Sequence, residues 1–186
     1  MNTFQIHIVE KCKQNDRQAQ MQLYNQYCDG MLIVALRFVK DTMEAEDIVQ
    51  EAFIKAFSKL DQYRAEVSFG AWLKRIVVNR CIDVLKSKRQ RIIELEDHHL
   101  NVVATNEDNN EWSVDDEITL ETVKAAIEEL PEKYKYVVML YLIEGYDHKE
   151  ISEILNISEV ASRTQLSRGK QKLQTQLKKV KNGTRS

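Results

Sequence analysis

Residues Phe69 to Arg91 constrain the fold most, because a single helix there has to carry two incompatible faces. Apolar residues recur at helical spacing and must be buried against neighbouring helices. They are Leu73, Val77, Cys81 and Val84 or Leu85. Between Lys74 and Arg91, seven basic residues accompany one acid, a net charge of +6. The stretch predicts either a core helix with a solvated basic face or a helix that binds a polyanion.

The rest of the chain has the same helical periodicity, with few residues that interrupt it. Its 186 residues include only five glycines and one proline, and no run of strand period appears. Leu, Ile, Lys, Glu and Gln recur at helical spacing instead, which is typical of helices. The sequence therefore predicts an all-α protein, long enough for one medium domain or two small ones.

An acidic stretch divides the chain in two. Nine acids and no lysine or arginine lie between Glu94 and Glu117. Charge repulsion and the scarcity of paired apolar residues oppose a compact fold there. We therefore predict two small helical domains, residues 1–92 and 118–182, joined by a flexible linker, residues 93–117, and followed by a tail, residues 183–186.

The small net charge of −2 hides a strong segregation of charge. Arg163 to Ser186 contains eight basic residues and no acid, so this segment and Lys74 to Arg91 together hold +14. The remainder of the chain sums to −16. We expect two separate polyanion-binding places and an acidic surface for a different partner.

The acidic surface is expected on the helix that spans residues 42–60. Thr42 is its predicted N-cap, and acids follow in the first turns, as a helix N-terminus favours. Its predicted buried stripe consists of Ile48, Ala52, Phe53, Ala56 and Leu60. The helix leaves Asp47, Gln50 and Glu51 projecting together as an acidic and amide patch.

The loop DQYRAEVSFG follows this helix and breaks the periodicity. It places Tyr63 and Phe69 among polar side chains. Such a loop suits either a plain connector or a site that holds a flat group, such as an unstacked base.

Residues 118–182 predict a helix-turn-helix. Asp147 and Glu150 form a capping box for the short helix HKEISEIL. Asn156 can adopt the left-handed conformation that ends this helix, and Ser158 can cap the next one, EVASRTQLSRGKQKLQTQL. Two helices joined by a short turn, the second one basic, are typical of a helix-turn-helix that binds DNA, although the same shape also occurs as architecture alone.

The second of these helices has a core side and a polar side. Leu166, Leu173 and Leu177 are expected in the core, with Gly169 on the same side, where backbones can approach closely. The opposite side offers guanidinium groups and small hydroxyls to base edges and phosphates of a major groove. Its residues are Arg163, Thr164, Ser167 and Arg168.

Two long segments resemble a known family. The string DTMEAEDIVQEAFIKAFSKLDQYRAEVSFGAWLKRIVVNRCIDVLK is similar to region 2 of the extracytoplasmic-function group (group 4) of sigma factors, in the bacterial sigma-70 superfamily. The string LPEKYKYVVMLYLIEGYDHKEISEILNISEVASRTQLSRGKQKLQTQL is similar to their region 4. The order, the spacing and the acidic linker fit the group, and no room is left for the region 3 of larger sigma factors.

The resemblance implies a protein that binds core RNA polymerase and directs it to promoters, and that is not an enzyme. The family's polymerase contact falls on Asp47, Gln50 and Glu51, which in relatives dock on the clamp helices. A carboxylate and amide patch pairs well with arginines of a partner helix. An anti-sigma factor is a further expected partner. The acidic linker is implied either to thread polymerase channels or to act as a passive tether.

The resemblance also implies two DNA sites. The basic helix and the loop before it would hold the melted minus-ten element, where stacking and edge hydrogen bonds partly recover the cost of flipping a base. The candidates are Tyr63, Arg64, Ser68, Trp72, Arg75, Asn79, Arg80 and Lys86. Trp72 has the alternative role of a core anchor. Asn79 is the expected base reader, because an amide on a basic face reads a base better than a lysine does.

Region 4 would read the minus-thirty-five duplex in the major groove. The candidates are Arg163, Thr164, Ser167, Arg168 and Lys170. The sequence departs from the family here: Val160 and Ala161 stand where Gly-Thr or Gly-Ala is usual, and Gly169 replaces the usual alanine. A glycine inside a helix costs about 1 kcal/mol relative to alanine.

Other classes of protein are not supported by the sequence. No apolar run reaches the roughly 18 residues of a membrane span, and no signal peptide is visible, so we expect a cytoplasmic protein without membrane insertion. Three widely spaced cysteines favour free thiols. His98 and His99 are adjacent and lack ligand spacing, so we predict no metal and no cofactor. The alternative function is a stand-alone helix-turn-helix regulator.

Overall fold

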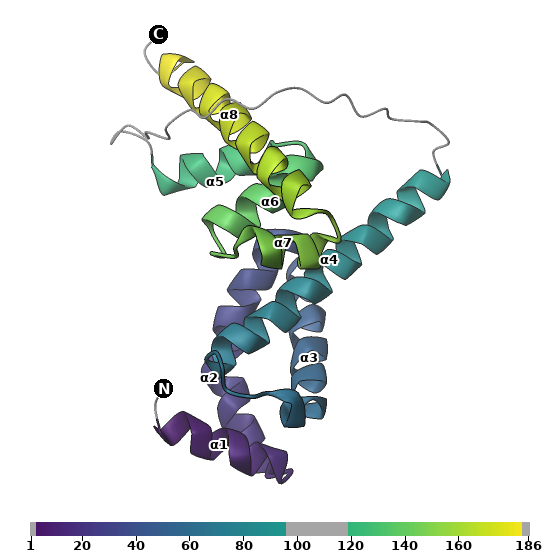
Figure 1. Cartoon of the computed structure of the whole chain (residues 1–186), viewed down its shortest axis with the longest axis vertical. Helices are drawn as coiled ribbons and strands as arrows, with labels where there is room; N and C mark the ends of the chain where they lie inside the picture. Colours follow the sequence, from purple (N-terminus) through teal and green to yellow (C-terminus); the bar gives the residue numbers. More distant parts are fainter. Residues whose placement is uncertain (1–2, 96–118, 184–186) are drawn as a thin grey trace. The chain divides into compact units, whose positions relative to one another are not determined.

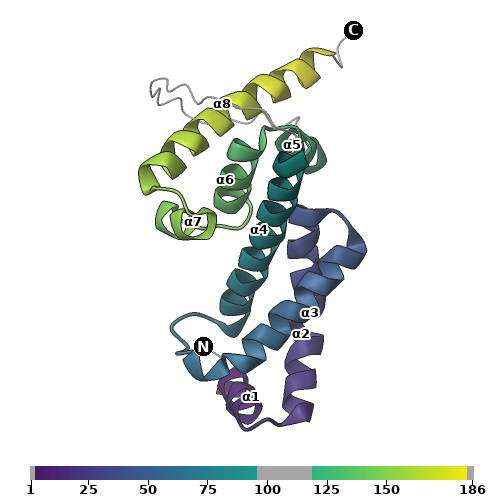
Figure 2. The ribbon, with the colours of Figure 1, turned by 90° about the vertical axis from the view of Figure 1, so that its right-hand side faces the viewer.

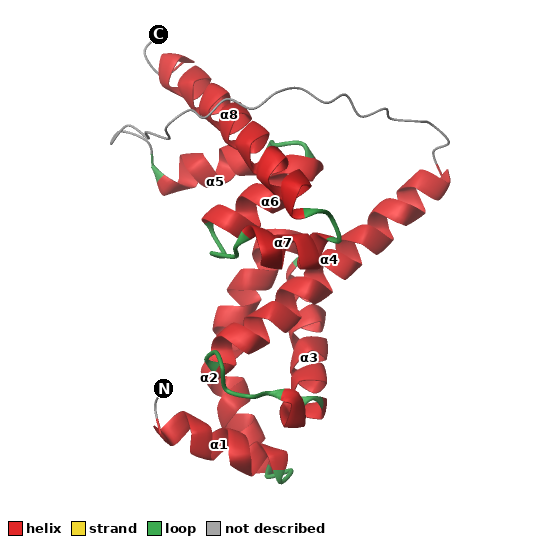
Figure 3. Cartoon of the chain, in the orientation of Figure 1, coloured by secondary structure: helices red, strands yellow, loops and turns green. Residues whose placement is uncertain are grey.

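The computed structural model describes residues 3–95 and 119–183, and all regular elements in these ranges are helices (Figure 3). The all-α prediction is confirmed for this part of the chain. The chain divides into two compact units, Met1–His99 and Leu100–Ser186, which are described separately. Most of the predicted linker lies outside the described residues.

The described residues of the first unit form four helices and one short 3-10 turn. In chain order these are α1 (Thr3–Lys13), α2 (Arg17–Val39), α3 (Thr42–Ser58), the turn η1 (Leu60–Gln62) and α4 (Phe69–Leu95). Helices α2, α3 and α4 pack against one another and lie side by side in Figures 1 and 2, while α1 contacts α2 and η1. Helix α4 continues three residues beyond residue 92, where we expected the domain to end.

The predicted apolar stripe of α4 forms the centre of this unit. Leu73, Val77 and Cys81 are completely buried, whereas Val84 and Leu85 are half-buried. The adjacent residues Val78 and Ile82 are buried as well, so α4 is covered on more than one side. The first three turns of the basic helix are therefore held as a core element, and its basic residues lie on the sides that remain.

The start of α3 differs from the prediction. Asp41, not Thr42, is the N-cap: its carboxylate accepts a hydrogen bond from the backbone N–H of Glu44 at 2.8 Å. Asp41 has the extended backbone conformation of a cap, while Thr42 is already helical. Both residue types make good caps, and the sequence pattern could not fix the boundary to one residue.

The second unit consists of α5 (Leu120–Glu128), α6 (Glu132–Leu142), α7 (His148–Leu155) and α8 (Glu159–Gly183). Helices α5, α6 and α7 all pack on α8. Asp147 and Glu150 form the predicted capping box of α7, and Asn156 ends it with φ of 57°. Ser158 Oγ accepts from the N–H of Ala161 at 3.1 Å. The predicted helix-turn-helix is thus α7, a left-handed turn and α8.

Gly169 allows α8 to pack unusually close to α6. A Cβ atom at this position would lie 2.5 Å from Cγ2 of Val138, which is too short for a van der Waals contact. Glycine lowers the stability of a helix relative to alanine, but here it allows α6 and α8 to approach closely, as the sequence led us to expect.

The described residues also bear on the cysteines and on membrane insertion. Cys12, Cys28 and Cys81 are free thiols, as predicted. Burial, and then the nearby Asp16, raises the pKa of the Cys12 thiol to about 11. None of the helices described for this chain combines the length and apolar character that crossing a membrane requires.

Candidate nucleic-acid interface

The acidic patch of α3 lies within a longer exposed stripe. Asp47, Gln50 and Glu51 are all exposed, and the side chains of Met43 and Ile54 are 77% and 69% exposed. At about 100° of rotation per residue, Met43, Asp47, Gln50 and Ile54 fall within an arc of about 60°. Glu51 lies about 40° outside this arc. The sequence pattern identified the polar centre of the stripe but not its apolar ends, which the same spacing could have revealed.

Ion pairs join the acidic helix α3 to the basic helix α4. Glu51 accepts a hydrogen bond from Nε of Arg80, and Lys88 Nζ lies 2.7 Å from a carboxylate oxygen of Glu44. The hydrogen bond to Glu51 raises the pKa of Arg80 above its ordinary value. The structure thus joins a predicted polymerase contact, Glu51, to a predicted DNA contact, Arg80.

Aromatic rings order the loop that precedes α4. The ring centroid of Tyr63 lies 5.2 Å from that of Trp72 and 5.9 Å from that of Phe69. The Tyr63 hydroxyl donates to the backbone carbonyl of Val67 at 2.7 Å, and the residue is buried. Tyr63 therefore fixes the shape of the loop, while Trp72 is half-buried and keeps part of its surface accessible.

The other minus-ten candidates form two groups. Trp72, Arg75, Asn79 and Lys86 fall within an arc of about 60° along α4, whereas Arg80 lies on the flank that faces α3. In the loop, Arg64 is exposed, and Ser68 Oγ accepts from the N–H of Ala71 at 3.2 Å. The arc along α4 combines one ring, one amide and two cations.

Of the minus-thirty-five candidates, Thr164, Ser167 and Arg168 lie on the sides of α8 away from its buried leucines. Lys170 and Arg163 differ from the prediction, since they lie only about 40° and 60° around the helix from the buried Leu166. Arg163 is exposed, and Thr164, Ser167, Arg168 and Lys170 are half-buried. Arg163 donates to Glu159, one turn earlier, at 3.2 Å. Thr164 Oγ1 donates to the carbonyl of Val160 at 2.9 Å. The helix thus presents guanidinium and hydroxyl groups on its surface. The carboxylate partner of Arg163, Glu159, belongs to α8 itself.

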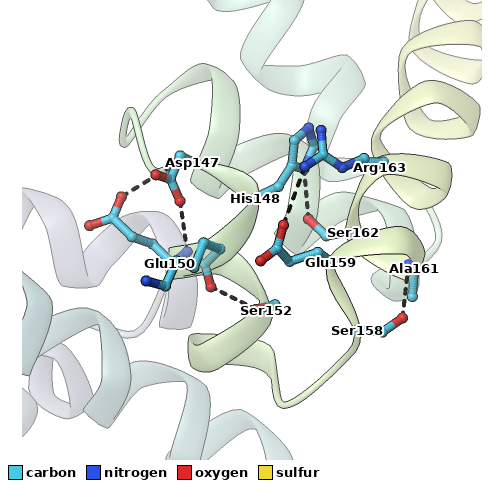
Figure 4. A network of polar contacts seen from close by, with 10 residues as sticks. Asp147, His148, Glu150, Ser152, Ser158, Glu159, Ala161, Ser162 and Arg163 are labelled. Carbon is cyan, nitrogen blue, oxygen red and sulfur yellow. Dashed lines mark hydrogen bonds and ion pairs between the residues drawn. The ribbon is translucent and has the colours of Figure 1, made fainter.

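His148 is a residue that the sequence pattern did not single out. Its Nδ1 lies 2.9 Å from Oγ of the fully buried Ser162, which joins α7 to α8 (Figure 4). Its ring stacks on Tyr141 with centroids 5.0 Å apart. Burial, and then the positive charge of Arg163, lowers the pKa of His148 below 6.5. No local sequence signal marked this contact, because it depends on how α7 packs against α8.

The described residues contain no cluster of three or more His, Cys, Asp or Glu side chains that could hold a metal ion. His98 and His99 lie outside these residues. The arrangement offers charged, hydroxyl and aromatic groups for binding.

Comparisons with protein families identify both units. The model of sigma-70 region 2 matches residues 23–91, and the model of sigma-70 region 4 matches residues 120–173. The first match spans α3, the aromatic loop and most of α4. The second spans α5 to α7 and the part of α8 that contains the minus-thirty-five candidates.

Curated relatives extend the similarity over nearly the whole chain. The chain is 32% identical over 183 residues to the ECF RNA polymerase sigma factor SigW of Bacillus subtilis, which covers 91% of this chain and 95% of the relative. It is 28% identical over 171 residues to the ECF RNA polymerase sigma-E factor of Escherichia coli, covering 88% of this chain and 89% of that protein.

Solved structures share the fold. CnrH in complex with the cytosolic domain of CnrY gives a TM-score of 0.56 at 21% identity, covering 94% of this chain and 97% of that one. The sigma factor RpoE of Bartonella quintana, solved with the anti-sigma factor NepR, gives 0.55 at 22% identity, covering 85% of this chain and 96% of that one.

Proposed function

Because this chain belongs to the extracytoplasmic-function sigma factors of the sigma-70 family, we propose that it binds core RNA polymerase through α3 and promoter DNA through α4 and α8. The chain is an RNA polymerase sigma factor. In this proposal α4 and its loop hold the melted minus-ten element, and α8 reads the minus-thirty-five duplex. The protein initiates transcription as a subunit of polymerase and is not itself an enzyme.

The observation that carries this division of roles is the difference in charge between the exposed stripe of α3 and the side of α4 that holds Arg75, Asn79 and Lys86. Helix α3 exposes Asp47 and Gln50 between two apolar side chains, a surface that repels phosphates and suits a basic protein partner. Helix α4 carries Arg75 and Asn79, which are half-buried, and Lys86, which is exposed, on one side, and these groups suit nucleic acid. One unit therefore offers separate surfaces to polymerase and to DNA.

The composition of the α3 stripe supports a protein partner. Interfaces gain most of their affinity from apolar anchors, while charged groups around them set orientation and rate of association. Met43 and Ile54 are such anchors, about 16 Å apart along the helix at 1.5 Å per residue. Asp47 and Gln50 between them then select the basic side chains of the partner.

We further propose an anti-sigma factor as a second protein partner. The support is that a structural neighbour, RpoE of Bartonella quintana, was solved with an anti-sigma factor. A cytoplasmic location belongs to the same proposal, because core polymerase and promoter DNA are found there.

The rival interpretation was a stand-alone helix-turn-helix regulator. It accounts for α7 and α8 but gives no role to the region 2 match over residues 23–91. Similarity to sigma factors over both units favours the initiation factor.

The proposal is tested with the full chain and its cognate core RNA polymerase, by measuring the affinity for core and run-off transcription. Met43→Ser combined with Ile54→Ser should weaken core binding by tenfold or more, about the loss of one or two interface anchors. The matched control is Met21→Ser with Ile33→Ser, since these α2 side chains are 59% and 56% exposed. The control should bind core as the unchanged protein does.

The outcomes separate the parts of the proposal. If the unchanged protein neither bound core nor supported run-off transcription, the sigma-factor function would be wrong. If it did both and the two double variants behaved alike, α3 would not be the polymerase surface.

A further inference from the structure

Val160 is an exposed apolar side chain at the end of the helix-turn-helix that would meet DNA. It is the second residue of α8, directly after the turn that Asn156 and Ser158 form. Its side chain is 71% exposed, the largest fraction among the large apolar side chains that the structure describes in the second unit. No packing within the unit explains a valine here, and a β-branched residue is a weak choice for a helix.

The position of Val160 on α8 is that of a reading residue. At about 100° per residue, Val160, Thr164, Ser167 and Gln171 fall within an arc of about 60°. Leu166, Leu173 and Leu177 are buried on the other side of the helix. Val160 therefore lies on the same side of α8 as Thr164 and Ser167, one turn nearer the N-terminus of the helix. In helix-turn-helix motifs, the N-terminal residues of the second helix approach base edges.

The polar groups next to Val160 have partners of their own. Thr164 gives its hydroxyl proton to the Val160 carbonyl, and Glu159 is paired with Arg163. Arg163, Arg168 and Lys170 give this end of the helix the charge that phosphates require. Beside these paired polar groups, the two methyl groups of Val160 are an exposed apolar surface at the first turn of α8.

We propose that Val160 determines promoter specificity by packing its methyl groups on the C5-methyl group of a thymine in the minus-thirty-five duplex. Among the base edges of the major groove, only thymine presents a methyl group, and apolar side chains recognise it by contact. The inference rests on the proposed function, because it requires α8 to lie in the major groove.

The test removes the methyl group from the DNA and from the protein in turn. A duplex is first selected from a randomised library with the full chain, and each thymine is then replaced singly by deoxyuridine, which lacks only the C5-methyl group. The unchanged protein should lose affinity about fourfold at one thymine, the ratio expected for exposing one methyl group to water. Val160→Ala should bind the thymine and deoxyuridine duplexes equally.

A control variant distinguishes this contact from a general loss of apolar surface. Leu142→Ala removes an exposed apolar side chain of α6 and should keep the fourfold penalty for deoxyuridine. A circular-dichroism spectrum like that of the unchanged protein would show that Val160→Ala leaves α8 folded.

The outcomes separate this inference from the proposed function. If the protein selected no duplex at all, the assignment of α8 to the minus-thirty-five element would be wrong. If it selected a duplex without thymine, or if Val160→Ala kept the deoxyuridine penalty, the contact between Val160 and thymine would be overturned while the function stood.

Discussion

The two basic helices of this protein, α4 and α8, hold their charges in different ways. In α4, Arg80 and Lys88 are paired with Glu51 and Glu44, which come from the neighbouring helix α3. In α8, Arg163 is paired with Glu159 of the same helix, one turn away. The charges of α4 are therefore part of the tertiary structure of its unit, whereas the Arg163 pair of α8 is local. Charge on α3 should consequently affect DNA binding by α4.

Two glycines inside helices, one in each unit, have different surroundings. Gly169 lets α8 approach α6, and a methyl group there would meet Val138. Gly30 lies within α2, and a methyl group there would meet nothing within 4 Å. The same substitution should therefore have opposite effects on stability at these two positions.

The largest expected effect comes from this pair of glycines. Gly169→Ala should lower the free energy of unfolding by about 1–3 kcal/mol, because the added methyl group overpacks the α6–α8 contact. Gly30→Ala should raise it by about 0.5–1 kcal/mol, the usual gain of alanine over glycine in a helix. Denaturant unfolding monitored by circular dichroism measures both. Val138→Ala in the Gly169→Ala background should cost less than it does alone, since it makes room for the methyl group.

If Gly169→Ala were as stable as the unchanged protein, Val138 would have moved aside at no cost. The close approach of α6 and α8 would then not be a constraint on the sequence.

The comparison of ion pairs predicts a smaller effect. Glu51→Gln should raise the affinity of the free protein for forked minus-ten DNA about threefold or more, because it releases Arg80 and removes a negative charge. Glu159→Gln should change duplex binding by about twofold or less, as expected for an exposed pair within one helix. Fluorescence anisotropy without polymerase measures both affinities.

Asp47→Asn is the control for net charge, since it removes an acid from α3 and should have a smaller effect than Glu51→Gln. Equal gains for Asp47→Asn and Glu51→Gln would mean that only net charge matters. Equal effects of Glu51→Gln and Glu159→Gln would remove the proposed difference between the two helices.

The smallest expected effect is on the pH dependence of the stability of the second unit. The folded unit disfavours the charged form of His148, through burial and Arg163 and Lys170, while Asp147 and Glu159 act in the opposite direction. The unfolded chain therefore binds the proton more readily, and stability should fall as the pH drops through 6.5. His148→Gln, which keeps a side-chain amide near Ser162, should reduce this fall between about pH 7.5 and pH 5.5.

Thermal unfolding of the two proteins at both pH values is the measurement. An identical pH dependence with and without His148 would assign the effect to other groups.

The sequence was sufficient to predict the helices and which of their faces are buried or polar. Leu73, Val77 and Cys81 recur at a spacing that only a helix buries, and capping residues such as Asp147 and Glu150 act on neighbours a few positions away. Contacts between distant segments could not be read in this way. Nothing in the local pattern shows that Glu51 meets Arg80 or that His148 meets Ser162, because each pair depends on how two helices are placed.

The same distinction applies to the residues of the candidate sites: some could be predicted from helical spacing, and others depend on the folded structure. The face shared by Arg75, Asn79 and Lys86 follows from helical spacing alone, as does the face of α8. The burial of Tyr63 and its hydrogen bond to Val67 do not, since they require the fold of the loop. The roles proposed for these residues in binding remain predictions.

Gly169 also limits how this protein can diverge. Val138 occupies the space that a Cβ atom at position 169 would need, so a larger residue at position 169 requires a change at position 138 as well. Relatives with alanine at this position are expected to carry a smaller residue, or a shifted helix, at the position of Val138. Grafting α8 from one such protein onto another should therefore succeed only when the matching residue of α6 is transferred with it.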